Sequence, residues 1–202
     1  ISSVDYAANF QAFLEATPND KPFCFWLGTK ERHRGYGLDN WKLDGRDLAD
    51  VVVPEYYPDN ETIRGDLADY AIEVEWYDKH IVQALKHLEA HGKLENTLII
   101  ATSDHGMPFP RVKGQEYEMS NHLPLAIMWA DGIKNPGRTI DDLISFIDLA
   151  PTYFEIAGVD WQSSAMAPSP GKSLTPFFSD TSLNPHRDFL LIGKERHDVG
   201  RP

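Results

Sequence analysis

The chain has 202 residues, a formal net charge of −12 and a hydrophobic content of 42%. This length corresponds to one domain, or one and a fraction, and it allows a sizeable apolar core. The acidic charge argues against nonspecific nucleic-acid binding, and no apolar run is long enough to cross a membrane. The sole cysteine, Cys24, excludes an internal disulfide, and its apolar neighbours predict a buried thiol. The first residues carry no signal-peptide pattern and read as mid-protein sequence.

The first elements are a helix and a strand. Residues 3–16 have the apolar periodicity of an amphipathic helix, with Ser3 as a candidate cap. Residues 22–28 form a continuous apolar run between a proline and a glycine, which is typical of a strand. A charged loop follows this predicted strand.

A long irregular stretch and a long helix come next. Residues 36–60 show little periodicity and predict a surface loop, whose aromatic side chains either pack beneath it or stack on a sugar. Residues 61–91 have apolar positions three and four apart and give the clearest helical pattern. Asp59 or Asn60 can cap this helix, and Gly92 can end it.

Three histidines on this helix raise the question of a zinc site. His87 and His91 are one helical turn apart, and His80 lies further back. No cysteine or carboxylate nearby completes a ligand set, so the pattern does not favour zinc.

A short apolar run that ends in Ser-Asp-His-Gly is the most informative segment. Residues 98–101 suit a buried strand, and Gly106 lets the chain turn after it. We therefore expect Asp104 and His105 on the loop at the strand's carboxyl end, where open α/β sheets keep their ligands. A hard oxygen ligand beside an imidazole is half of a divalent-metal site. The alternative is that Asp104 caps a turn and His105 is a surface residue.

Three further elements follow. Residues 123–130 predict another buried strand, and residues 141–157 predict a helix. Pro151 is expected in the first turn of a second helical piece that starts at Asp148, where its missing donor costs nothing. Residues 188–193 predict a last strand.

The segment after the Asp-His pair carries a second pattern. Its residues are Lys113, Gly114, Tyr117, Glu118 and Pro124, spaced as Lys-Gly-x-x-Tyr-Glu followed by a proline. With the Asp-His-Gly motif, this segment resembles the sulfatase family of the alkaline-phosphatase-like superfamily. It looks most like the heparan N-sulfatase (sulfamidase) branch. His122 stands where the family pattern has an arginine, and the resemblance extends over about residues 23–196.

The resemblance implies a fold and a domain arrangement. The fold would be α/β, a partial alkaline-phosphatase-like three-layer sandwich over residues 1–160. Residues 161–202 would form a linker and the start of a small C-terminal subdomain. The order of the predicted elements independently favours an α/β sheet with helices on its faces.

The resemblance also implies roles for five residues. Asp104 and His105 would hold a divalent metal, in the first place Ca²⁺, with Mn²⁺ or Zn²⁺ as alternatives. Lys113 would bind the sulfate group of the substrate. His33, the histidine after the predicted strand at 22–28, would contact the bridging atom as proton donor; a loop histidine is otherwise most often simply exposed. His122 would touch the sugar.

Two parts of the family pattern are missing from the sequence. Sulfatases carry an upstream Asp-Asp metal pair and a Cys-x-(Pro/Ser/Ala)-x-Arg segment whose cysteine becomes formylglycine. Cys24 is followed by Phe-Trp-Leu-Gly and cannot be that residue. The resemblance therefore implies a fragment of a hydrolase that removes sulfate esters or N-sulfate groups, with sulfated glycans as its substrates. The fragment would be inactive by itself, because the nucleophile segment is missing. A phosphodiesterase or phosphonate hydrolase of the same superfamily, or a truncated non-catalytic product, remains the alternative.

Local charge and location complete the expectations. Basic side chains gather in two groups: Lys30, Arg32, His33 and Arg34, and then Arg111 and Lys113. Together the two groups would form a positive funnel on an acidic body, or they are ordinary solvated loop charges. The resemblance implies a periplasmic, secreted or lysosomal location, with no nucleic-acid partner and no membrane insertion.

Overall fold

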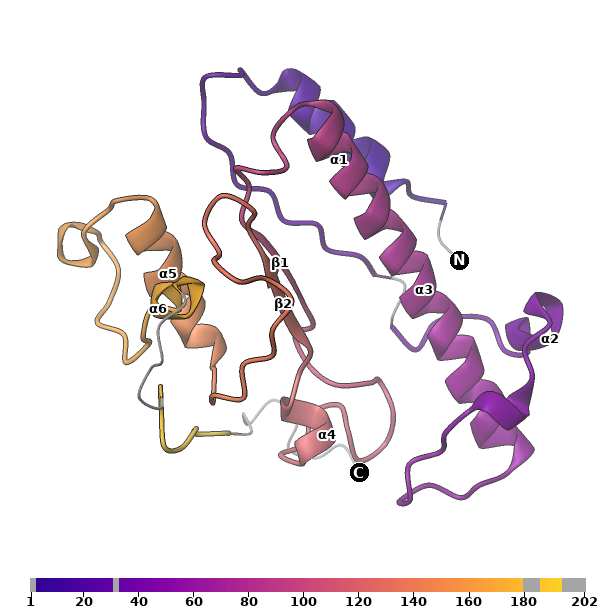
Figure 1. Ribbon diagram of the computed structural model, residues 1–202. Helices are drawn as coiled ribbons and strands as arrows, with labels where there is room; N and C mark the ends of the chain where they lie inside the picture. Colours follow the sequence, from indigo (N-terminus) through magenta and orange to yellow (C-terminus); the bar gives the residue numbers. More distant parts are fainter. Residues whose placement is uncertain (1–2, 31–32, 180–185, 194–202) are drawn as a thin grey trace. The chain divides into compact units, whose positions relative to one another are not determined.

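The computed structural model describes residues 3–30, 33–179 and 186–193. These residues form helices and one small antiparallel sheet (Figure 1). They divide into two compact units. Unit 1 comprises residues 1–94 and 107–113, and unit 2 comprises residues 95–106 and 114–202. The short stretch 107–113 thus packs with unit 1 although its flanks belong to unit 2, while the sequence-based boundary at residue 160 stays a prediction.

Unit 1 is built on two packed helices, α1 (Tyr6–Ala16) and α3 (Glu61–Ala90), drawn side by side in Figure 1. The cap of α1 is Asp5 rather than Ser3, because the Asp5 carboxylate accepts a hydrogen bond from Ala8 N at 2.9 Å. Asn60 caps α3 as predicted. No helix in the described part of the chain is long and apolar enough to cross a membrane.

The two helices bury mainly apolar side chains. The buried hydrophobic residues on them are Ala7, Phe10, Leu14, Leu67, Ala68, Ile72, Ala84 and Leu88. His80 is buried among them, and its Nδ1 accepts a hydrogen bond from Ala7 N at 3.3 Å. His80 therefore joins the two helices, and no group of three metal-binding side chains occurs among the described residues.

Residues 22–28 do not form the predicted strand, although they are extended. Phe23 and Phe25 point inward, and the Phe25 ring centroid lies 4.7 Å from that of Phe10 on α1. Cys24 and Trp26 point outward, so the prediction of a buried thiol is wrong. The apolar run reflects packing of one face on α1; a strand also needs a hydrogen-bonded neighbour, which no described segment supplies.

The irregular stretch 36–60 contains two short helical turns, α2 (Asn40–Asp44) and η1 (Leu48–Asp50). A buried carboxylate on α3 holds its first part in place. Asp69 accepts hydrogen bonds from the backbone nitrogens of Asp39 at 2.8 Å and Trp41 at 2.7 Å. The loop prediction is therefore right in outline, and the loop is anchored by a helix side chain.

Unit 2 contains the sheet, in which β1 (Ile99–Thr102) pairs antiparallel with β2 (Leu125–Met128). β2 lies within the predicted run 123–130, and β1 overlaps the predicted run 98–101 but extends one residue further, to Thr102. Neither is fully buried: β1 is intermediate throughout, and alternate residues of β2 are exposed. A two-stranded sheet leaves much of its surface uncovered, so the predicted burial of these strands is wrong for this chain.

The helix predicted for residues 141–157 begins later and is broken. It starts as the 3₁₀ turn η2 (Phe146–Asp148) and continues as α5 (Leu149–Ile156). Pro151 lies in the first turn of α5, as predicted. A proline cannot bond to the carbonyl four residues earlier and clashes with it, which explains why no continuous helix runs through this point.

The end of the chain is largely irregular. The turn η3 (Trp161–Ser163) and the short helix α6 (Thr175–Phe178) are its only regular elements among the described residues. Residues 188–193 do not form the predicted strand, and the Leu191 side chain is 90% exposed. As with residues 22–28, an apolar run without a neighbouring strand in the described chain does not become one.

Candidate active site

The Asp-His pair lies on the loop that follows β1, as predicted. Gly106 lies in this loop without adopting the left-handed backbone conformation. Side chains and backbone hold this loop. Ser103 Oγ donates to His105 O at 2.5 Å, and Gly106 N donates to the carbonyl of Ser120 at 3.1 Å. The loop thereby rests on the short helix α4 (Glu118–Asn121), which precedes His122.

The two side chains of the pair face each other. His105 Nε2 lies 3.7 Å from Asp104 Oδ2, and His105 Nδ1 lies 2.7 Å from its neighbouring carbonyl, Gly106 O. With a proton on Nδ1 donated to this carbonyl, Nε2 keeps its lone pair toward the carboxylate. An imidazole nitrogen and a carboxylate oxygen at this spacing fit two adjacent positions around one divalent ion. Among the described residues, no third His, Cys, Asp or Glu side chain joins these two in a group that could hold a metal ion.

His33 follows a turn in unit 1 in which its own nitrogen donates to Lys30 O at 3.1 Å. The side chain of His33 is exposed. Its neighbour Arg34 anchors this loop to α3. The Arg34 guanidinium forms an ion pair with Asp66 on α3 and donates a hydrogen bond of 3.1 Å to the Tyr36 hydroxyl. Arg32 of the predicted basic group lies outside the described residues.

Lys113 ends a tight turn in the 107–113 stretch of unit 1. Its backbone nitrogen donates to Phe109 O at 3.3 Å, while Val112, wholly buried, anchors the turn. Arg111 has a φ of 66° and Gly114 a φ of 70°, so the chain adopts the left-handed region on both sides of Val112 and Lys113. The Lys113 side chain itself is exposed.

The structure brings the loops of His33 and Lys113 together. The Arg34 guanidinium carbon lies 4.9 Å from the centre of the Phe109 ring. A second contact is made by Tyr57, whose hydroxyl donates to Pro110 O at 2.5 Å. Burial, with Tyr56 alongside, raises the pKa of Tyr57 to about 12, and the nearby charges of Arg111 and Arg34 act in the opposite direction. Arg34 from the first basic group and Arg111 from the second therefore lie near one aromatic cluster, formed by Tyr57, Tyr70 and Phe109.

His122 follows α4 in unit 2 and is paired with an acid. Its Nδ1 lies 2.6 Å from Glu118 Oε1, and both side chains are about four-fifths exposed, at 79% and 80%. The link between Gly106 and Ser120 places this histidine in the segment next to the Asp-His loop. His33 and Lys113 belong to unit 1, whereas Asp104, His105 and His122 belong to unit 2.

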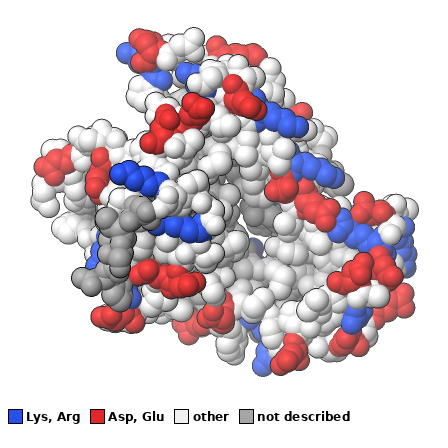
Figure 2. Space-filling view, in the orientation of Figure 1, with Lys and Arg blue, Asp and Glu red and all other residues white. Residues whose placement is uncertain are grey.

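The wider surface is mixed in charge. Figure 2 shows acidic and basic side chains interspersed over the described residues of the face drawn, without one continuous basic area. The net charge of −12 agrees with this pattern. Attraction of an anionic ligand would therefore be local, at the aromatic cluster that carries Arg34 and Arg111.

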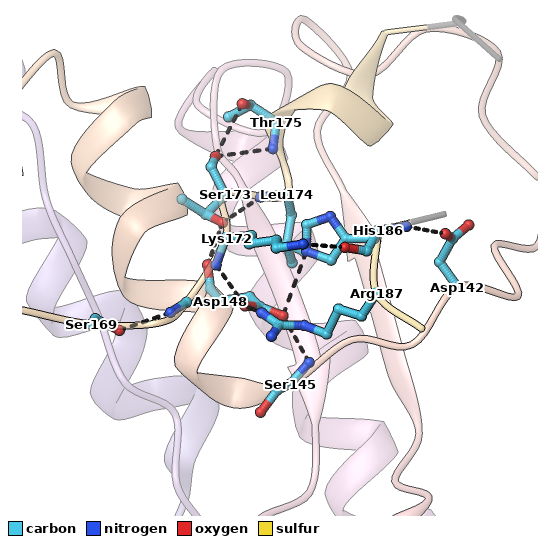
Figure 3. Close-up of polar contacts among 12 residues, drawn as sticks. Asp142, Ser145, Asp148, Ser169, Lys172, Ser173, Leu174, Thr175, His186 and Arg187 are labelled. Atoms are coloured by element: carbon cyan, nitrogen blue, oxygen red, sulfur yellow. Dashed lines mark hydrogen bonds and ion pairs between the residues drawn. The ribbon is translucent and has the colours of Figure 1, made fainter. Parts of the chain in front are cut away.

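The sequence reasoning missed a buried polar network in unit 2, centred on Asp148 (Figure 3). Asp148 is wholly buried. Its carboxylate accepts hydrogen bonds from the backbone nitrogens of Ser145 at 2.9 Å and Lys172 at 2.7 Å, and it forms an ion pair with Arg187. His186 Nε2 lies 3.7 Å from the same carboxylate. Lys172, His186 and Arg187 come from positions distant in the sequence, which no local pattern reveals.

Comparison with known proteins gives a consistent result. The family model described as "Sulfatase" matches residues 1–159. Human N-sulphoglucosamine sulphohydrolase is 30% identical over 164 residues, which cover 79% of this chain and 32% of the relative. Human N-acetylglucosamine-6-sulfatase is 28% identical over 206 residues, covering 94% and 36%. The chain therefore spans about a third of the length of these curated relatives.

Two solved structures have the same fold. The candidate sulfatase yidJ of Bacteroides fragilis matches with a TM-score of 0.63 and 22% identity, covering 76% of this chain and 36% of that one. A phosphonate monoester hydrolase from Silicibacter pomeroyi matches with a TM-score of 0.55 and 29% identity, covering 71% and 28%. The described residues are thus part of an alkaline-phosphatase-like α/β fold, as predicted.

Proposed function

Because the chain belongs to the sulfatase family, we propose that it is part of a longer hydrolase that removes sulfate from sulfated glycans, as sulfate esters or N-sulfate groups. The names of the two human relatives support a sulfated amino sugar as substrate. The coverage of about a third of those relatives supports a fragment. The nucleophile, a formylglycine, would come from a segment outside this sequence.

The observation that carries the proposal is the facing pair on the β1 loop, with His105 Nε2 3.7 Å from Asp104 Oδ2. These residues would hold one side of a divalent metal, of which Ca²⁺ fits the family and Mn²⁺ or Zn²⁺ also fit the ligands. When bound, such an ion supplies positive charge to the nonbridging oxygens of the sulfate group.

The remaining residues take the other roles of sulfuryl transfer. The Lys113 ammonium binds a sulfate oxygen, and His33 gives a proton to the leaving atom of the sugar. His122 contacts the sugar once its pairing with Glu118 is exchanged for the substrate. Each of these side chains is exposed and therefore accessible to a ligand.

A sulfatase assay tests the proposal at two lengths. The 202-residue chain should not hydrolyse an aryl sulfate, because it lacks the nucleophile, and metal-dependent turnover by this chain would contradict the fragment proposal. The full-length gene product should hydrolyse it. In that protein, Lys113→Ala should lower turnover at least about a hundredfold while the unfolding free energy changes by less than about 0.5 kcal/mol. Lys134→Ala, a change of another surface lysine, is the matched control.

The similarity to a phosphonate monoester hydrolase supports one alternative substrate class. The same Asp-His pair and lysine would suit a phosphonate or phosphate diester, because that group is also a tetrahedral anion. Comparing kcat/KM of the full-length protein for matched sulfate and phosphonate esters separates the two. A preference for the phosphonate would replace the sulfatase proposal with this alternative.

A further inference from the structure

Phe109 touches both loops that carry the proposed sulfate-contacting residues. Its ring lies beneath the guanidinium of Arg34, the residue next to His33, at 4.9 Å. Its carbonyl oxygen accepts the backbone hydrogen bonds of Val112 at 3.2 Å and Lys113 at 3.3 Å. One side chain and its own backbone therefore connect two segments that are about eighty residues apart in the sequence.

The surroundings hold Phe109 in one position. The ring is buried, at 7% exposure, and meets the Tyr70 ring of α3 edge-on, with centroids 5.6 Å apart and planes at 86°. Tyr57 packs on it from the irregular stretch, with centroids 6.4 Å apart, and also bonds to Pro110. An aromatic ring enclosed in this way has little rotational freedom, so it can serve as a rigid support.

Arg34 is held equally well from the other side. It forms an ion pair with Asp66 on α3, and the Tyr36 hydroxyl bridges the two by accepting from Arg34 and donating to Asp66 Oδ1 at 3.2 Å. A planar guanidinium can stack on a ring and keep its in-plane donors for a carboxylate, which an ammonium cannot do. The Arg34 position is thus determined by Asp66 and Phe109 together.

We propose that Phe109 and Arg34 are positioning residues, which hold His33 and Lys113 as one preformed anion-binding surface. This inference rests on the proposed function, since it assumes that Lys113 binds sulfate. A sulfate group is small, so groups that contact it must be placed within a fraction of an ångström. A lysine and a histidine on two independent loops would lose this placement through loop motion.

Binding of inorganic sulfate to the 202-residue chain tests the proposal. NMR titrations at constant ionic strength, with chloride as the reference anion, follow the amide and side-chain signals of His33 and Lys113. Phe109→Leu keeps an apolar side chain but removes the ring face, so sulfate binding should weaken about tenfold. Phe109→Tyr, which keeps the ring, should restore binding to within about twofold of the wild type.

A matched control separates positioning from general packing. Phe10 is buried to a similar degree, at 5% exposure, in the same unit but on α1. Phe10→Leu should leave sulfate binding within about twofold of the wild type. Arg34→Lys should weaken binding as Phe109→Leu does, and the double variant should be no weaker than either, because both changes cut the same connection.

Three results would overturn the inference, and they point to different faults. Equal losses in Phe10→Leu and Phe109→Leu, or wild-type binding in Phe109→Leu, would show that the ring only contributes to packing. Unchanged sulfate binding in Lys113→Ala would instead contradict the proposed sulfate role of Lys113, and the positioning role would fail with it.

Discussion

The two units of the chain hold their irregular segments in different ways. All but two of the buried hydrophobic residues of the described chain belong to unit 1, the exceptions being Leu174 and Phe178. Unit 1 therefore has an apolar helix pair and an aromatic cluster as its core. Unit 2 has a half-exposed two-stranded sheet, and its most buried side chains include Asp148 and Thr152.

One buried aspartate in each unit sharpens this difference. Asp69 accepts two backbone hydrogen bonds and forms no ion pair with any described residue. Asp148 also accepts two, but it is paired with Arg187 and lies near His186. Where apolar burial is plentiful, the carboxylate only has to satisfy backbone donors. Where apolar burial is scarce, as in unit 2, the carboxylate joins separate segments, and an ion pair lies in the interior.

The largest effect is expected from Asp148→Ala. This change leaves the Arg187 charge and two backbone donors buried without their acceptor, which should lower the unfolding free energy of unit 2 by about 3–5 kcal/mol. Hydrogen exchange measured by mass spectrometry reports each unit separately. Asp141→Ala, an exposed neighbour, should change stability by less than about 0.5 kcal/mol. Equal exchange in Asp148→Ala and Asp141→Ala would refute the central role of Asp148.

A smaller effect is expected from Asp69→Ala in unit 1. Two backbone donors lose their acceptor, but no described cation is left unpaired, so the cost should be about 1–3 kcal/mol. Asp69→Asn, which keeps an acceptor oxygen, should recover most of it, whereas Asp148→Asn should remain close to Asp148→Ala. If the two asparagine variants behave alike, charge is not what distinguishes the two sites.

The smallest effect concerns pH. Burial lowers the pKa of His186 below its ordinary 6.5, against the opposing effect of Asp148. In acid below this value, the unfolded chain binds more protons at this histidine than the folded chain, so stability decreases as pH falls below about 6.5. His186→Gln should flatten this part of the stability profile in urea titrations between pH 7 and pH 5. An unchanged slope in the variant would mean that other groups produce it.

Local sequence patterns predicted elements that depend on nearby residues. The helix at 61–91 was predicted almost to the residue, because its periodicity and its Asn60 cap lie within the element itself. The β1 loop with Asp104 and His105 was also placed correctly. The strands predicted at 22–28 and 188–193 are absent, because a strand is defined by a neighbour and the same apolar run can pack on a helix instead.

In the candidate site, too, the features that depend on nearby residues were predicted and those that depend on distant contacts were not. The residue types of Asp104 and His105, on a loop after a strand, were enough to predict a metal pair. The anion-binding role of Lys113 came from the resemblance to the sulfatase family, and both roles stay predictions. The joining of the Lys113 and His33 loops through Phe109 and Arg34 was not readable from either loop alone. It depends on Asp66 and Tyr70, which reach these loops only because α3 passes beneath them.

By itself, the sequence determined the family, the long helix with its cap, and the positions of the chemically capable side chains, because each depends on short-range order along the chain. Only the tertiary structure decided which side of α3 is buried, that Cys24 is exposed, and that Asp148 binds partners from two distant segments, at Lys172 and at residues 186–187. Those outcomes depend on contacts between distant residues, whose free energies exist only once the chain has folded.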